Sequence, residues 1–341
     1  MKPFARSSCL LLPMALAVAV VTATIAGCFS DSRRDDSTIR ITGSDTMVNL
    51  AQAWAEAYHE AHPDISSPVR GGGSGVGIAA LINGKVDVAT ASRAMKDKEI
   101  ALARQNTGKE PKQFIVGRDA LAIYVHKDNP LDEITIDALA EIYGEDGTIT
   151  TWPQLGVDNA DCAGGEIIRI SRQNNSGTYA YFREIVLGEK REYKQGATAQ
   201  SGSSELVTLI SRTPCAIGYS GMGYYRPGEV KMLRVSRKKG EPAIEPTLET
   251  ALDNTYPISR PLYIYTLGEP TGAVQEFVEW ILGPEGQKIV ADVGYVPNPK
   301  ATETPSAGGD SGDNRSADKG PVAAGADPAA NDASPRAAGQ P

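Results

Sequence analysis

The sequence has few of the side chains that bind metals or carry out acid–base catalysis. It contains three histidines and four cysteines in 341 residues, and neither type forms a cluster. His59 and His62 have a spacing that could suit a metal, but Pro63 follows at once, so we interpret them as solvated residues at a helix end. We therefore expect no metal and no other cofactor. No nucleophile is paired with a base either, so enzymatic activity is not expected.

An excess of basic residues is also missing. The formal net charge is -8, which argues against nucleic acid as a partner. Such a surface would also repel an anion at long range, so an anion site would have to depend on local dipoles and hydrogen bonds in a sheltered cleft. No repeat period is present. With 41% hydrophobic residues, the chain can bury one large core or two medium ones.

The N-terminal segment has the layout of an export signal. A basic start precedes an apolar run over residues 10–25, and Ile25-Ala26-Gly27 precedes Cys28. This layout resembles the signal of bacterial lipoproteins, in which that cysteine carries the lipid. A short transmembrane anchor is the alternative, although the apolar run is slightly short for one. We predict a lipoprotein signal peptide over residues 1–27 and a polar tether over 28–37. The protein would then be periplasmic or at the cell surface, lipid-anchored to a membrane.

The cysteine positions are consistent with export. Cys9 lies in the signal and Cys28 would take the lipid, so Cys162 and Cys215 remain for the folded part. Two thiols in an oxidising compartment suggest one disulfide, between a glycine-rich loop and the strand that begins near Pro214. Two separate buried thiols are the alternative.

The most informative stretch runs from Ser171 to Phe182. It follows an alternating apolar run that predicts a strand, and it leads into an amphipathic helix. Ser176 is a good N-cap residue, and Gly177 removes a side chain that would block close approach. The first N–H groups of the helix and the guanidinium of Arg172 make this turn a candidate anion site. Alternatively, it is an ordinary strand-to-helix turn, with the serine as a cap and the arginine paired with a surface carboxylate.

Small hydroxyl residues recur at other predicted strand ends. Gly43-Ser44-Asp45-Thr46 follows a short strand and opens a helix, and Gly71-Gly72-Gly73-Ser74-Gly75 opens another. Ala91-Ser92-Arg93 follows a predicted strand over residues 86–89. A strand over 114–126 is expected to lead into a second lobe, and a strand over 261–266 to return to the first.

Beyond about Pro299 the composition shifts to Ala, Gly, Ser, Asp and Pro, with no aromatic residue. Such a segment cannot bury enough surface to offset the entropy of ordering, so we predict a disordered tail over residues 300–341.

Taken together, these motifs resemble the phosphate-binding protein of the high-affinity phosphate ABC transporter. The resemblance covers about residues 38–299 and is carried by Thr42–Met47, Gly71–Gly77, Val86–Arg93, Arg172–Thr178, Ala216–Tyr219 and Ser259–Tyr265. It implies an α/β, two-lobed periplasmic-binding-protein fold of type II, with two α/β domains joined by two crossover segments. Lobe I would comprise residues 38–120 and 260–299, and lobe II residues 121–259.

The resemblance further implies a monomeric receptor that captures inorganic phosphate between its lobes and delivers it to the permease of an ABC transporter. A receptor for another oxyanion, such as sulfate or molybdate, is the alternative within the same class. A secreted hydrolase of phosphate esters is the alternative from another class, and turnover of a chromogenic phosphate ester would reveal it.

Carried over residue by residue, the resemblance assigns phosphate binding to groups from both lobes. The set is Ser44, Asp45, Thr46, Ser74, Gly75, Ser92, Arg93, Arg172, Ser176, Gly177 and Thr178. Well-studied long-chain members have an aspartate where this sequence has Arg93, and that carboxylate accepts the proton of hydrogen phosphate. We hypothesise that Asp45 supplies the acceptor here and that Arg93 adds charge. Alternatively, Asp45 only caps the first helix.

Overall fold

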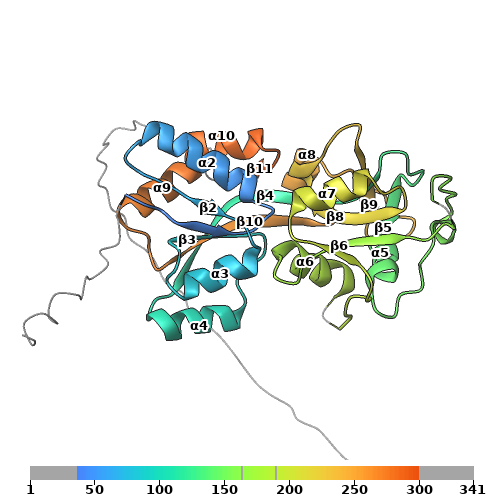
Figure 1. Cartoon of the computed structure of the whole chain (residues 1–341), viewed down its shortest axis with the longest axis horizontal. Helices are drawn as coiled ribbons and strands as arrows, with labels where there is room; N and C mark the ends of the chain where they lie inside the picture. The colour runs from blue at the N-terminus through green and yellow to red at the C-terminus, as the bar shows by residue number, and fades with distance from the viewer. Residues whose placement is uncertain (1–36, 163, 189, 299–341) are drawn as a thin grey trace, which may run out of the picture. The chain divides into compact units, whose positions relative to one another are not determined.

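The computed structural model describes residues 37–298, except 163 and 189 (Figure 1). The predicted signal peptide, all but the last residue of the predicted tether, and the predicted disordered tail lie outside the described residues. Within the described part, no helix combines the length and the apolar character needed to cross a membrane.

One half of the fold is built on a mixed sheet in the order β2-β1-β3-β10-β4. Strands β1 (Ile41–Gly43), β2 (Val69–Arg70) and β3 (Val88–Ala91) are parallel. Strand β10 (Ser259–Leu267) runs antiparallel between β3 and β4 (Pro111–His126), and β11 (Val296–Pro297) pairs with β4. The third strand thus lies two residues further along the chain than the predicted range 86–89. We call this part the first half.

Helices cover both faces of this sheet (Figure 1). Helices α2 (Val48–Ala61), α9 (Gly272–Leu282) and α10 (Pro284–Asp292) lie on one face, and α3 (Ser74–Ile82) and α4 (Asp97–Thr107) lie on the other. Trp54, Tyr58 and Phe277 pack together in the core of the first face, because their helices turn apolar stripes toward the sheet.

The second half is built around the C-terminal part of β4. There β4 pairs antiparallel with β8 (Ala216–Gly221) and β9 (Val230–Ser236). The parallel strands are β6 (Ile168–Arg172), which pairs with β8 and β7 (Thr198–Gln200), and β5 (Glu133–Thr135), which pairs with β9. The helices are α5 (Ile136–Tyr143), α6 (Gly177–Phe182), α7 (Ser203–Ser211) and α8 (Leu248–Leu252), with a π-helical turn over Arg183–Leu187 and 3-10 turns over Trp152–Leu155 and Met222–Tyr224.

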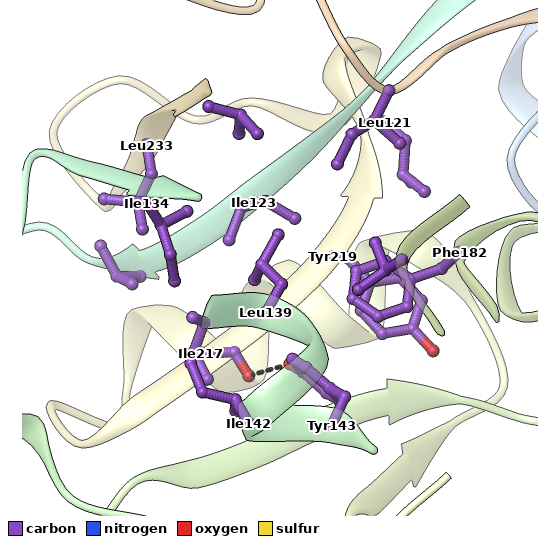
Figure 2. Close-up of a cluster of buried hydrophobic side chains, with 14 of the residues drawn as sticks. Leu121, Ile123, Ile134, Leu139, Ile142, Tyr143, Phe182, Ile217, Tyr219 and Leu233 are labelled. Atoms are coloured by element: carbon purple, nitrogen blue, oxygen red, sulfur yellow. Dashed lines mark hydrogen bonds between the residues drawn. The ribbon is translucent and has the colours of Figure 1, made fainter. Parts of the chain in front are cut away.

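The core of the second half is aromatic (Figure 2). Phe182 stacks on Tyr219 with ring centroids 3.8 Å apart, and Tyr143 contacts both rings edge-on. The Tyr143 hydroxyl donates to the Ile217 carbonyl at 2.9 Å, so its polar end is satisfied inside the core. This packing fixes α6 against β8 and so sets the position of the turn that precedes α6.

Strands β4 and β10 connect the halves. They are paired from Ser259 and Ala120 to Leu267 and Pro111, and β4 then continues into the second half. All elements of the second half other than β4 lie between β4 and β10 in the sequence, so this half is inserted into the first.

The predicted disulfide between Cys162 and Cys215 is confirmed, with the Cα atoms 5.1 Å apart. It ties the loop before β6 to the residue before β8. The alternative of two separate thiols therefore does not apply.

Candidate functional site

Three serine side chains of the first half meet at one edge of its sheet. Ser44 follows β1, Ser92 follows β3, and Ser74 is the first residue of α3. The Ser44 hydroxyl donates to the Ser92 hydroxyl at 3.0 Å, and the Ser92 N–H donates to the Ser74 hydroxyl oxygen at 3.0 Å. All three are at least 98% buried. The carboxyl ends of parallel strands meet at the same edge of a sheet, which is why β1 and β3 bring Ser44 and Ser92 together there.

The turn before α6 brings the second half against this serine cluster. Ser176 caps α6, since its hydroxyl oxygen accepts from the N–H groups of Thr178 and Tyr179. A Cβ on Gly177 would lie 2.3 Å from the Ser74 Oγ and 2.6 Å from the Ser92 Oγ. Only a glycine allows this approach, as the sequence predicted for that position.

Two threonine hydroxyls join the halves directly. The Oγ1 atoms of Thr46, before α2, and Thr178, in α6, are 2.7 Å apart, and both residues are buried. Asn175 adds two bonds nearby, because its side-chain amide donates to the Gly72 carbonyl and its own carbonyl accepts the Gly75 N–H. The N–H of Gly75, a predicted ligand, is therefore used in a contact between the halves.

Arg172 and Asp45 form an ion pair between the halves. One terminal nitrogen of Arg172 donates to Asp45 Oδ2 at 3.0 Å and to the Ser201 carbonyl, and the other donates to the Ser203 hydroxyl. Among the described residues, the buried Arg172 Nε has no hydrogen-bond partner. Burial lowers the pKa of the Arg172 guanidinium, and the nearby Asp45 opposes that shift.

Asp45 does not cap the first helix. Its Oδ1 accepts the Gly72 N–H at 2.7 Å and its Oδ2 accepts from Arg172 at 3.0 Å, whereas the residue at the N-cap of α2 is Met47, which makes no side-chain cap. Each carboxylate oxygen can accept a further bond, because it has two lone pairs.

A second ion pair, which the sequence did not reveal, lies under the two threonines. Arg260 and Asp119 are register partners on β10 and β4, and their side chains are 1% and 0% exposed. Arg260 donates to Asp119 Oδ2 through Nε at 3.1 Å and through a terminal nitrogen at 2.8 Å. That terminal nitrogen also donates to the Oγ1 atoms of Thr178, at 3.1 Å, and Thr46, at 3.4 Å. Arg260 thus touches groups from both halves.

The electrostatic setting of this pair follows from its burial. Burial raises the pKa of the Asp119 carboxyl, and the attraction of Arg260 opposes the rise. In the sequence, Asp119 is visible as a charged residue inside an apolar strand pattern, and Arg260 as an arginine within Ser259–Tyr265. Neither pattern shows that the two side chains meet.

Arg93 lies outside the hydroxyl cluster. Its guanidinium donates to both carboxylate oxygens of Glu99 in the first turn of α4, at 2.8 and 2.7 Å, and to the Ala94 carbonyl. The structure therefore brings together all predicted site residues except Arg93, and adds Asp119 and Arg260. Across the described ranges, no three His, Cys, Asp or Glu residues are arranged to hold a metal ion.

The cluster offers hydroxyl and guanidinium donors from two halves of one fold, which suits an oxyanion. The family described as the PBP superfamily domain matches residues 30–285. The phosphate-binding protein PstS of Pseudomonas aeruginosa is 35% identical over 267 residues, covering 75% of this chain and 82% of that protein.

Solved structures of similar proteins point to the same family. A protein from Clostridium perfringens, described as a phosphate ABC transporter substrate-binding protein with bound phosphate, is 29% identical with a TM-score of 0.67, covering 76% of this chain and 99% of its own. An ABC-type phosphate transport receptor from Vibrio cholerae is 26% identical with a TM-score of 0.61, covering 76% and 100%.

The fold and the site together define a substrate-binding protein of the periplasmic-binding-protein superfamily, which confirms the predicted fold class. More specifically, the chain belongs to the phosphate-binding protein PstS family.

Proposed function

We propose that the chain captures inorganic phosphate outside the cytoplasm and delivers it to the permease of an ABC transporter. The observation that carries the proposal is the convergence of buried hydroxyls from both halves near Arg172, whose buried Nε has no acceptor among the described residues. An uncompensated buried donor costs free energy, and an oxyanion oxygen would satisfy it. The phosphate held by the Clostridium perfringens relative supports the same ligand.

In this proposal the phosphate oxygens accept bonds from both halves. The donors are the hydroxyls of Ser44, Thr46, Ser74 and Ser92 in the first half, with Arg172 and the Ser176-Gly177-Thr178 turn in the second. Because the anion contacts both halves, binding stabilises the closed arrangement, as expected for hinge closure around a ligand. We place the lobes at residues 38–120 with 260–299 and at 121–259. The pairing of β4 with β10 as far as Ala120 and Ser259 supports that boundary.

Asp45 is the proposed acceptor for the proton of hydrogen phosphate. Its carboxylate lies beside Ser44 and is held by Arg172 and the Gly72 N–H, with lone pairs to spare. Sulfate has no such proton at neutral pH, so it would leave the partly buried carboxylate facing another anion. An Asp45→Asn variant should therefore lose much of its preference for phosphate over sulfate in calorimetric titrations. Unchanged discrimination would remove Asp45 from this role.

The anchor is part of the proposal as well. We propose that residues 1–27 are cleaved and that Cys28 carries the lipid, with residues 28–37 as a tether to the membrane. Cells that produce the chain should incorporate labelled fatty acid into it, and a Cys28→Ser variant should not. Labelling of both forms would place the lipid elsewhere.

The direct test of function is calorimetry on the chain without residues 1–28, titrated with phosphate, arsenate, sulfate and molybdate. Tight binding of phosphate and arsenate, with weak binding of the other two, supports the proposal. A preference for sulfate or molybdate would assign the chain to another oxyanion.

A further inference from the structure

We infer that Arg260 is a positioning residue that orients the bonded hydroxyl pair of Thr46 and Thr178 so that it donates its remaining proton to the bound anion, and that Asp119 holds Arg260 in place for this task. The inference rests on the proposed phosphate site. It assigns a role in ligand selection to an ion pair located where the two connecting strands run side by side.

The position of Arg260 is strongly determined. Its side chain lies on β10 directly opposite Asp119 on β4, and both are almost completely buried. Three of its bonds are to groups outside the hydroxyl pair: two to Asp119 Oδ2 and one to the Ser92 carbonyl at 3.1 Å. The Tyr181 ring also lies 5.5 Å from the guanidinium carbon. A planar guanidinium held by this many partners has little freedom to turn.

The bonds to the threonines fix the direction of their protons. A guanidinium only donates, whereas a hydroxyl has one proton and two lone pairs. The terminal nitrogen of Arg260 has two N–H groups: one is directed at Asp119, and both Oγ1 atoms accept from the other, which they share at 3.4 Å for Thr46 and 3.1 Å for Thr178. Each hydroxyl oxygen uses one of its own lone pairs to accept from Arg260, so the proton of that hydroxyl must point away from Arg260.

The two hydroxyls also bond to each other at 2.7 Å, and that contact uses one of their two protons. The other proton of the pair stays available, and an oxyanion oxygen that approaches the pair can accept it. Arg260 and the mutual bond together use three of the pair's four lone pairs, so a ligand O–H group would find only one acceptor position left. The pair therefore favours deprotonated oxygens at this point of the site.

Asp119 acts through Arg260. Its Oδ2 accepts two bonds from Arg260, and its Oδ1 accepts the Met222 N–H at 3.1 Å. The Asp119 carboxylate balances the buried positive charge of Arg260. The threonine hydroxyls are therefore oriented without a net positive charge, which would attract all anions without discrimination.

The test removes both charges together, because removal of one partner would leave the other charge buried and unpaired. An R260Q/D119N variant should still fold, as measured by circular dichroism and thermal unfolding. Its dissociation constant for phosphate should rise at least about tenfold, because the oriented hydroxyl donor is lost. The matched control is R40Q/D87N, which removes a part-buried arginine–aspartate pair that also has two side-chain bonds but lies apart from the hydroxyls. That control should stay within about twofold of the wild type.

A double-mutant cycle separates positioning from general stability. Thr178→Val should weaken phosphate binding in the wild-type background and should have much less effect in the R260Q/D119N background, because the hydroxyl is no longer oriented there. Fully additive losses would overturn the inference. So would wild-type affinity in R260Q/D119N, provided that the wild type itself binds phosphate. Failure of the wild type to bind phosphate would instead reject the proposed function.

Should R260Q/D119N not fold, Arg260→Lys carries the test. Lysine keeps the charge beside Asp119, but a single ammonium group cannot serve both threonines and the Ser92 carbonyl in a fixed plane. Folded Arg260→Lys protein should bind phosphate about tenfold more weakly. Unchanged affinity with intact selectivity would overturn the inference.

Discussion

Substitution of Gly177 by alanine is expected to block closure around the ligand without damaging either half. Gly177 is the first residue of α6 and its φ is not in the left-handed region, so an alanine fits the helix and even favours it. The obstruction comes from the other half. The added Cβ would lie 2.3 Å from the Ser74 Oγ, 2.6 Å from the Ser92 Oγ and 3.0 Å from the Ser74 Cβ.

The size of the effect follows from these distances. Nonbonded carbon contacts are favourable at about 3.5–4.0 Å, so the halves must separate by about 1 Å at this point. Hydrogen bonds to a charged partner contribute about 1.5–3 kcal/mol each, and a shift of this size weakens those that one half makes to a bound anion. A loss of about 3 kcal/mol corresponds to an affinity for phosphate about 100-fold lower.

Calorimetry with phosphate measures this loss, and thermal unfolding provides the second readout. The melting temperature of Gly177→Ala without ligand should match that of the wild type, but the increase on addition of phosphate should largely disappear. Gly202→Ala is the control, because its Cβ would meet only the flexible end of the Glu205 side chain at an ordinary backbone φ. A Gly177→Ala protein that binds phosphate within about threefold of the wild type would refute the predicted contact between the halves.

Three further results are expected. A C162S/C215S variant should lose about 3–4 kcal/mol of unfolding free energy in urea, because the disulfide closes a loop of 53 residues, yet it should keep its affinity for phosphate. Burial alone would raise the pKa of Glu99, but bonds from Arg93 and the Lys96 N–H outweigh it and lower the pKa. The Arg93–Glu99 pair should therefore stabilise the fold at neutral pH and lose this effect as the pH falls through the folded-state pKa of Glu99. In an Arg93→Gln variant the melting temperature should fall less steeply as the pH is lowered, and the affinity for phosphate should change less than about twofold. Asn175→Ala removes one bond between the halves, worth about 1 kcal/mol, and titration should show about fivefold weaker phosphate binding; no change would show that this bond does not support closure.

The hydroxyl cluster could be predicted because each of its members is marked by its local sequence. Ser44 and Ser92 directly follow strand patterns, and Ser176 stands before a helical stripe, so their place at strand and helix ends needs no knowledge of distant contacts. Parallel strand order brings Ser44 and Ser92 to one edge, but the meeting of Ser176 with them was implied only by the family resemblance.

The Arg260–Asp119 pair could not be found in this way. The two residues are separated by 141 positions, and they meet only because β4 and β10 pair in one particular register. A one-residue slip would turn one of the side chains to the opposite face of the sheet. In a single sequence, a charged residue within an apolar strand is therefore not distinguishable from one that faces solvent at the strand's end.

The position of the Arg93 guanidinium depends on whether it bonds to Glu99 or to the serine hydroxyls, and the Ala91-Ser92-Arg93 motif does not show which partner it takes. Arg93 is next to Ser92, but Glu99 on the first turn of α4 offers a carboxylate that is also bonded by the Lys96 N–H. A bidentate carboxylate outcompetes neutral hydroxyls for a guanidinium. Asp45, which faces Arg172 across the two halves, is left as the acid within the serine cluster.

The insertion of one half into the other has a mechanical consequence. The described chain begins and ends in the first half: Thr38 bridges to Ser66, and β11 pairs with β4 at Arg118. Any attachment before Ser37 or after Asn298 therefore pulls on that half alone. The inserted half contains neither end of the described chain, and within the described residues β4 and β10 are the two segments that join it covalently to the first half.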